Sequence, residues 1–206
     1  MLQPALPFDW PDDSADTAFI VTPSNAAAVR HLDAIGTWPV AATLLVGPRQ
    51  SGRSLLARIF ARRSGGRIID DADRGDERAS FTAWNEAQAS RRPVLLVAEA
   101  APPAWAIALP DLRSRMAATP IVKLGDPDDA LVAGLLEALL ARRGLAVAPE
   151  TIAYLTPRAP RTHYGVIALV DALDTASLSQ RRRVTVPLAR AVLAGRSLID
   201  DEPLEG

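Results

Sequence analysis

Cysteine is absent from the sequence, and this excludes disulfide bonds and thiolate metal sites. Histidine occurs only as His31 and His163, and two residues so far apart in sequence do not suggest a zinc site. Aromatic residues make up 5% of the chain, which disfavours a nucleic-acid platform of stacked rings. No apolar run is long enough to span a bilayer, and no basic segment precedes an apolar core at the N-terminus. We therefore expect a cytoplasmic protein with no membrane contact.

Basic and acidic residues are nearly balanced, with 23 Lys and Arg against 24 Asp and Glu. The formal net charge is −1, which argues against a surface dominated by attraction to nucleic acid, and we expect no direct sequence-specific DNA binding. A local basic cluster at residues 181–183 could contact phosphate, although a solvated helix end is the simpler interpretation. The composition that remains is that of an ordinary globular protein: 206 residues, 49% hydrophobic and 23% charged, enough for one good core or two small ones.

Residues 47–54 read GPRQSGRS and match the phosphate-binding pattern GxxxxGK[ST] except at the lysine. The glycines allow backbone N–H groups to close around phosphate oxygens, and the Ser54 hydroxyl is placed to bind Mg²⁺. A strand-like run at 43–46 precedes the loop and a helical run at 55–60 follows it, so the helix N-terminus faces the phosphate. A glycine turn between a buried strand and a helix is the alternative. The nucleotide site predicted from this loop comprises Gly47, Gln50, Ser51, Gly52, Arg53, Ser54 and Leu55.

Arg53 stands where the pattern expects lysine. Arginine keeps the positive charge but presents a wide planar fork, so the two residues are not interchangeable beside a γ-phosphate. We expect ADP or ATP to bind with Mg²⁺, and hydrolysis to be poor.

A second strand-like run, residues 67–73, ends in carboxylates in the manner of a Walker B motif. Asp70 would accept hydrogen bonds from the water shell of Mg²⁺, and Asp71 stands where a carboxylate would polarise an attacking water. We count both in the nucleotide site. Capping of the next helix, expected over 77–89, is the alternative for these aspartates, and it is preferred for Asp73.

The remaining pattern predicts two parts. Further strands at 93–99 and 121–124, with a helix near 112–116 between them, indicate a parallel α/β sheet. Residues 126–129, Asp-Pro-Asp-Asp, are a strong helix start, with Asp126 as cap and Pro127 at the first helical position. The expected helices are 26–35, capped by Ser24 or Asn25, then 126–143, 149–155, 161–181 and 187–193. The expected organisation is an extended tail (1–12), an α/β nucleotide-binding base (13–125), a small all-helical lid (126–198) and an acidic C-terminal tail (199–206).

With these motifs in this order, the chain resembles the DnaA-related AAA+ family of P-loop proteins and, within it, the Hda group of replication regulators. The resemblance covers nearly the whole chain. It rests on the Arg53-Ser54 pair, on a QxxLxF tail at Gln3, Leu6 and Phe8, and on the segment LPDLRSR at 109–115. The chain also stops after the lid, without the helix-turn-helix DNA-binding domain of DnaA.

The resemblance implies that Gln3, Leu6 and Phe8 dock on the β subunit of DNA polymerase, the sliding clamp. An extended, proline-containing segment loses little entropy when it docks in an apolar pocket. An unstructured tail with a few apolar residues is the alternative interpretation.

The resemblance also implies roles for two arginines. Arg115 would be an arginine finger, offered in trans to the γ-phosphate in a neighbouring subunit. A solvated or salt-bridged arginine is the alternative, and Arg113 lies nearby. Arg161 is placed like the sensor arginine that contacts bound phosphate from the lid. If the alignment slips, Tyr164 takes that place and Arg158 becomes the substitute.

Two departures from the family are visible. Only residues 64–66 separate the loop helix from the Walker B strand, so one strand and one helix look deleted. The resemblance then implies four strands in the order fourth, first, third, second. The sensor position at 98–100 reads Ala-Glu-Ala, without an amide or hydroxyl, which further lowers the expected hydrolysis.

The function expected from this resemblance is regulation of replication initiation. The protein would bind ADP, dock on the DNA-loaded clamp and stimulate hydrolysis of DnaA-bound ATP, and homo-oligomers are compatible with this role. One alternative is an autonomous P-loop ATPase that uses Asp71 and Arg161 and loads replication proteins. The other is a scaffold with a vestigial nucleotide site.

Overall fold

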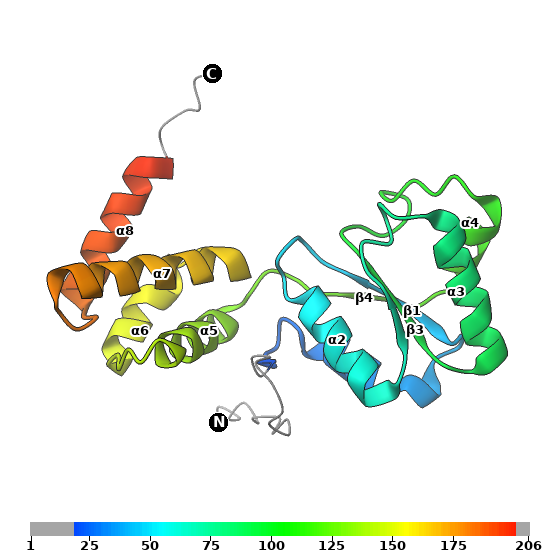
Figure 1. Cartoon of the computed structure of the whole chain (residues 1–206), viewed down its shortest axis with the longest axis horizontal. Coiled ribbons are helices and arrows are strands. Elements are labelled where there is room, and N and C mark those ends of the chain that lie inside the picture. The colour runs from blue at the N-terminus through cyan, green and yellow to red at the C-terminus, as the bar shows by residue number, and fades with distance from the viewer. Residues whose placement is uncertain (1–18, 201–206) are drawn as a thin grey trace, which may run out of the picture. The chain divides into compact units, whose positions relative to one another are not determined.

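The computed structural model describes residues 19–200, with side chains described as far as residue 195. The chain divides between Asp126 and Pro127 into two compact units (Figure 1). The predicted clamp-docking residues Gln3, Leu6 and Phe8 lie outside the described residues, as do residues 201–206.

The first unit is an α/β base with a four-stranded sheet. Its elements in chain order are α1 (Ala26–Asp33), the 3-10 helix η1 (Ile35–Thr37), β1 (Ala42–Val46), α2 (Arg53–Ser64), β2 (Arg67–Ile69), α3 (Glu77–Ser90), β3 (Val94–Ala98), α4 (Pro110–Ala117) and β4 (Ile121–Lys123). All neighbouring strands are parallel, in the order β2-β3-β1-β4, which confirms the predicted sheet.

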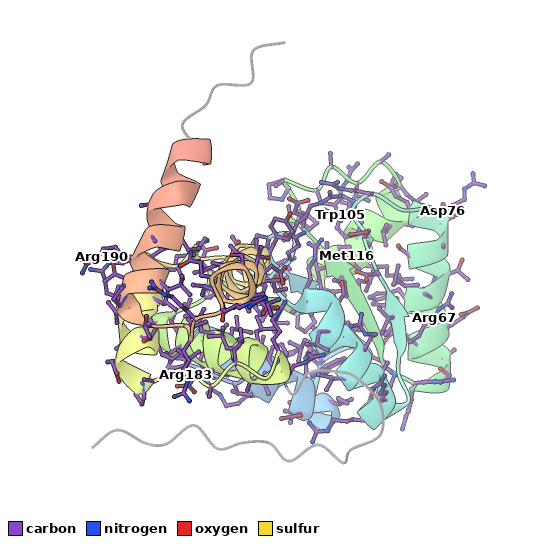
Figure 2. The ribbon with its side chains drawn as sticks, turned by 60° about the vertical axis from the view of Figure 1, so that its left-hand side comes forward. Arg67, Asp76, Trp105, Met116, Arg183 and Arg190 are labelled. Atoms are coloured by element: carbon purple, nitrogen blue, oxygen red, sulfur yellow. The ribbon has the colours of Figure 1, made fainter. Side chains whose placement is uncertain are left out.

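The sheet is covered on both faces, which is why its central strands are continuous apolar runs. Every residue of β1 and β3 is buried. Because side chains alternate along a strand, Leu44 and Leu96 pack in the core beneath α3 and α4, whereas Leu45 and Leu95 pack with α1 and α2. Figure 1 shows α2 on one side of the strands and α3 and α4 on the other. Figure 2 labels Trp105 and Met116, which belong to the α3/α4 core.

The two outer strands, β2 and β4, are each three residues long. The sequence predicted that the β2 run would continue to Asp73, but the strand ends at Ile69 and a turn follows. Asp71 has a φ of +47°, and its carbonyl accepts hydrogen bonds from the backbone N–H groups of Arg74 and Gly75, both at 2.9 Å. This tight turn ends the strand, and only the Ala72 backbone N–H still donates to β3 within the turn, to the Val97 carbonyl at 2.8 Å.

The cap predicted for α3 was also wrong. Asp76 is the N-cap, and its carboxylate accepts from the Arg78 backbone N–H at 2.9 Å. Asp73 lies too early in the chain for that role, and its Oδ2 accepts from the Glu99 backbone N–H at 3.0 Å instead. Asp73 therefore joins the turn after β2 to the end of β3.

The second unit is all-helical. Its elements are α5 (Asp129–Arg142), α6 (Pro149–Leu155), the 3-10 helix η2 (Thr156–Arg158), α7 (His163–Gln180) and α8 (Val186–Asp200). The start predicted for α5 was wrong, because the cap is Asp128, which accepts from the Leu131 backbone N–H at 2.8 Å, so Pro127 precedes the cap. Helix α8 runs past Leu193 into the stretch expected to be a tail. No helix within residues 19–200 is long and apolar enough to cross a membrane.

Candidate nucleotide-binding site

A glycine-containing loop connects the buried end of β1 to the first turn of α2. A Cβ atom on Gly47 would lie 2.9 Å from Ser51 Oγ and 3.0 Å from the Leu124 carbonyl oxygen, so the loop closes only with glycine there. Gly52 is the N-cap of α2, with a φ of +86° and no side-chain capping bond at this end of the helix. The first N–H groups of α2 are therefore available to an anion.

The loop, the first turn of α2 and the turn after β2 enclose a hollow of about 350 Å³. Its lining residues are Arg49, Gln50, Gly52, Arg53, Ser54, Leu55, Arg58 and Asp71. The Ser51 hydroxyl is buried without a hydrogen-bond partner in the described part of the chain. An unpaired buried hydroxyl beside uncapped N–H groups is a donor set that fits phosphate oxygens. Ser54, on the same turn, is the residue that would hold Mg²⁺ there.

Arg53 is the charged group at the centre of this loop. Its side chain is only 7% exposed. Nη1 donates to the Gly47 carbonyl oxygen at 2.7 Å, and Nη2 lies 3.3 Å from Asp71 Oδ1. The guanidinium thus ties the start of α2 to the start of its own loop and to the turn after β2.

The two predicted Walker B carboxylates are placed differently. Asp71 is the partner of Arg53, and its side chain is 59% exposed. Asp70 is exposed and does not line the hollow, and its Oδ1 accepts from the Asp71 backbone N–H at 3.1 Å. The loop therefore meets Asp71, while a role of Asp70 toward Mg²⁺ stays a prediction.

Arg115 is presented differently from Arg53. It is exposed on α4, and its guanidinium carbon lies 4.8 Å from the centre of the Trp84 ring. Within residues 19–200 the guanidinium makes no hydrogen bond or ion pair, whereas Arg113 donates to the Ile107 carbonyl through Nε at 3.2 Å and Nη2 at 2.6 Å. Of the two neighbouring arginines, Arg115 is the one whose donors remain available.

The two candidate sensor arginines, Arg161 and Arg158, make contacts within the helical unit. Arg161 lies just before Thr162, the N-cap of α7, and its Nη1 is 2.6 Å from Asp129 Oδ1. Arg158 stacks over Tyr154, 4.2 Å from the ring centre, and donates to the Tyr154 carbonyl at 2.9 Å. Which of the two arginines serves as the sensor stays a prediction.

Comparisons with known proteins match this arrangement. The family model described as "Hda, lid domain" matches residues 129–193. Domain III of the replication initiation protein DnaA from Thermotoga maritima superposes with a TM-score of 0.65 at 15% identity, over 86% of this chain and 94% of that one. The chain thus matches the Hda lid-domain model over its helical unit and has the fold of DnaA domain III. AMPPCP-bound DnaA from Aquifex aeolicus superposes on this chain with a TM-score of 0.62 at 15% identity, over 79% of this chain and 65% of that one.

Sequence relatives add less detail. An uncharacterized protein of Haemophilus influenzae is 32% identical over 118 residues, which is 57% of this chain and 51% of the relative. The match thus spans about half the length of that relative. The family model and the superposition thus agree on a DnaA-like fold with a lid of the Hda type.

The base also holds a carboxylate whose partners the sequence did not predict. At the end of β3, Glu99 Oε2 lies 2.5 Å from Arg74 Nη2 and 3.6 Å from Arg49 Nε. One carboxylate thus pairs with the phosphate loop and with the turn after β2. The signal available in the sequence was a lone acid at a strand end opposite a basic residue in the loop.

The two histidines do not line the hollow. Burial lowers the pKa of His31 and of His163 below the ordinary value. His31 Nε2 lies 2.9 Å from the Thr43 hydroxyl, and its ring stacks on Trp38 at 5.2 Å. Both histidines are therefore structural residues that favour the neutral form.

Proposed function

We propose that this protein is a cytoplasmic regulator of replication initiation that holds ADP at its own loop and offers Arg115 to ATP bound by DnaA. Gln3, Leu6 and Phe8 dock it on the DNA-loaded sliding clamp. The observation that carries the proposal is the contrast between two arginines. Arg53 is buried and bonded within its loop, whereas Arg115 is exposed with its donors available.

The loop supports retention of a diphosphate. The uncapped N-terminus of α2 and the buried Ser51 hydroxyl supply donors to phosphate oxygens. Arg53 Nη1 donates a hydrogen bond to the Gly47 carbonyl, so the guanidinium lacks the freedom of a lysine ammonium beside a γ-phosphate. Mg²⁺, when bound, would offset phosphate charge, held by Ser54 and through water by Asp70.

Asp71 and a bound phosphate compete for Arg53. The Arg53–Asp71 distance is 3.3 Å and the carboxylate is mostly exposed, so this contact is the one that nucleotide can displace. Asp71→Asn removes the competitor and a negative charge near the phosphates, and we expect it to tighten ADP binding several-fold in calorimetry. Arg53→Met should weaken ADP binding. No binding of ADP or ATP to the unchanged protein would favour the scaffold with a vestigial site.

Arg115 acts on another protein's nucleotide in this proposal. Its guanidinium stabilises the charge that develops on a γ-phosphate during hydrolysis. The test is single-turnover hydrolysis of DnaA-bound ATP with DNA-loaded clamp. Arg115→Ala should lower the stimulated rate by about 10³-fold or more, the scale of arginine-finger effects. Arg113→Ala is the matched control, two residues earlier on the same helix, and should retain stimulation.

The remaining parts of the proposal have separate readouts. Gln3→Ala with Phe8→Ala should abolish clamp binding in surface plasmon resonance, whereas Arg115→Ala should leave it intact. Unchanged affinity in the double variant would contradict the docking role. Hydrolysis by the isolated protein that disappears in Asp71→Asn would favour the autonomous ATPase instead.

A further inference from the structure

A closed set of contacts surrounds the base of Arg115. Trp84, on α3, lies beneath the guanidinium. Its indole Nε1 donates to the Thr119 hydroxyl at 3.0 Å, and that hydroxyl donates to the Arg115 carbonyl oxygen at 2.8 Å. The side chain and the backbone of Arg115 are therefore held by the same pair of residues.

Both holding residues are buried, with Trp84 6% and Thr119 5% exposed. A hydroxyl has one proton to donate and lone pairs to accept with, so Thr119 is satisfied in both directions. The indole N–H has its partner too, and this fixes the rotation of the ring. The plane on which the guanidinium rests is thus set from within the core between α3 and α4.

The contact leaves the chemistry of Arg115 intact. A guanidinium over an aromatic ring is attracted through its face, while its N–H donors lie in its plane. Stacking on Trp84 therefore orients Arg115 without using a donor. The rotamer freedom that a long side chain would lose on reaching a phosphate is already restricted.

We propose that Trp84 and Thr119 are positioning residues for Arg115. Trp84 supports the guanidinium so that its donors face a phosphate on another protein, and Thr119 fixes the ring and the end of α4. This inference rests on the proposed function, because it assigns these two residues to the arginine that acts in trans.

The first test separates rate from recruitment. The rate of hydrolysis of DnaA-bound ATP is measured against the concentration of this protein on DNA-loaded clamp. Trp84→Leu and Thr119→Val should lower the maximal rate by about tenfold with an unchanged half-saturating concentration, since misplacing a catalytic group costs rate. Trp84→Phe keeps an aromatic ring, which attracts a cation more weakly than indole does, and should lower the maximal rate about threefold.

Conservative and matched variants distinguish an effect on the position of Arg115 from a loss of folding. Thr119→Ser keeps the hydroxyl and should keep the full maximal rate. Thr43→Val removes another buried hydroxyl of the same unit, the partner of His31, and should leave the stimulated rate unchanged. Circular dichroism checks each fold. If Thr119→Val does not fold, the proposal is still tested by comparing the maximal rates of Trp84→Phe, expected to be reduced, and Thr119→Ser, expected to be full.

A second readout does not depend on DnaA. In the full chain, NMR of labelled arginine should show the Arg115 side-chain protons shifted upfield by the Trp84 ring current, and Trp84→Leu should abolish the shift. Loss of the shift together with no effect of Arg115→Ala on hydrolysis would refute the proposed function while leaving the contact established. An unshifted Arg115 signal, or a normal maximal rate in both Trp84→Leu and Thr119→Val while Arg115→Ala is inactive, would overturn the positioning role.

Discussion

Replacing Arg53 by methionine should destabilise the nucleotide-free base by more than the Arg53–Asp71 ion pair contributes to its stability. Methionine keeps most of the apolar stem and removes the guanidinium. The lost bond to the Gly47 carbonyl is short, at 2.7 Å, and buried. A hydrogen bond from a charged donor contributes about 1.5–3 kcal/mol to stability. The ion pair with Asp71 adds little, because its partner is 59% exposed and such pairs contribute up to about 1 kcal/mol.

We therefore expect Arg53→Met to lower the free energy of unfolding by about 2–3 kcal/mol, the hydrogen-bond contribution plus a small share of the pair. Asp71→Asn should lower it by less than about 1 kcal/mol. Urea denaturation followed by tryptophan fluorescence measures both changes. The signal reports on the base, because Trp38, Trp84 and Trp105 lie there and residues 127–206 contain no tryptophan.

The ratio of the two effects is the decisive result. Equal losses in Arg53→Met and Asp71→Asn would show that the ion pair, and not the carbonyl bond, holds Arg53. No loss in Arg53→Met would mean that the guanidinium does not brace the loop at all. The measurement is made without nucleotide, since ADP would stabilise the folded state by mass action and mask the difference.

Two further predictions concern the loop and the histidines. Gly47→Ala places a Cβ 2.9 Å from Ser51 Oγ, so the loop must shift; we expect loss of ADP binding in calorimetry and a destabilisation of about 1–3 kcal/mol, and unchanged affinity would contradict the tight closure. His31 and His163 have a lowered pKa in the folded state, so the unfolded chain takes up protons first as the pH falls. The contribution of the two histidines to stability is therefore fully present above the unfolded pKa of about 6.5. It is lost as the pH falls toward their lower pKa values in the folded state. The urea midpoint should drop between pH 7.5 and 5.8, and replacing both by glutamine should flatten that drop; an equal drop in the double variant would exclude the histidines as its cause.

The sheet could be predicted because its signals are local and continuous. Apolar runs of strand length on both sides of a glycine loop, and too few residues before Asp70 for another strand and helix, predicted four parallel strands. Their observed order was implied by the family resemblance. Helix starts were less predictable where carboxylates crowd together. Asp73 and Asp76 are both able to cap a helix, as are Asp126 and Asp128, and only the turn geometry selects the later residue of each pair.

The candidate site was predictable in its residues and not in their partners. The motif predicted the position of Arg53. Its hydrogen bond to the Gly47 carbonyl could not be predicted, because it depends on how the loop closes around a guanidinium, which is wider than a lysine ammonium. The resemblance selected Arg115, but the sequence alone does not distinguish it from Arg113, because both lie on the exposed surface of one helix turn. Their difference comes from a loop carbonyl, Ile107, and from a ring on another helix, Trp84, which no local pattern relates to them.

The short outer strands of the sheet restrict how partners can approach. Arg67 on β2 and Lys123 on β4 are exposed basic residues on edges of only three residues each (Figure 2 labels Arg67). An edge with few unpaired backbone groups and a solvated charge is a poor template for an added strand. Loss of length in the sheet therefore protects this base against edge-to-edge aggregation. It also means that recognition by another protein must proceed through side chains rather than through a shared β-ladder.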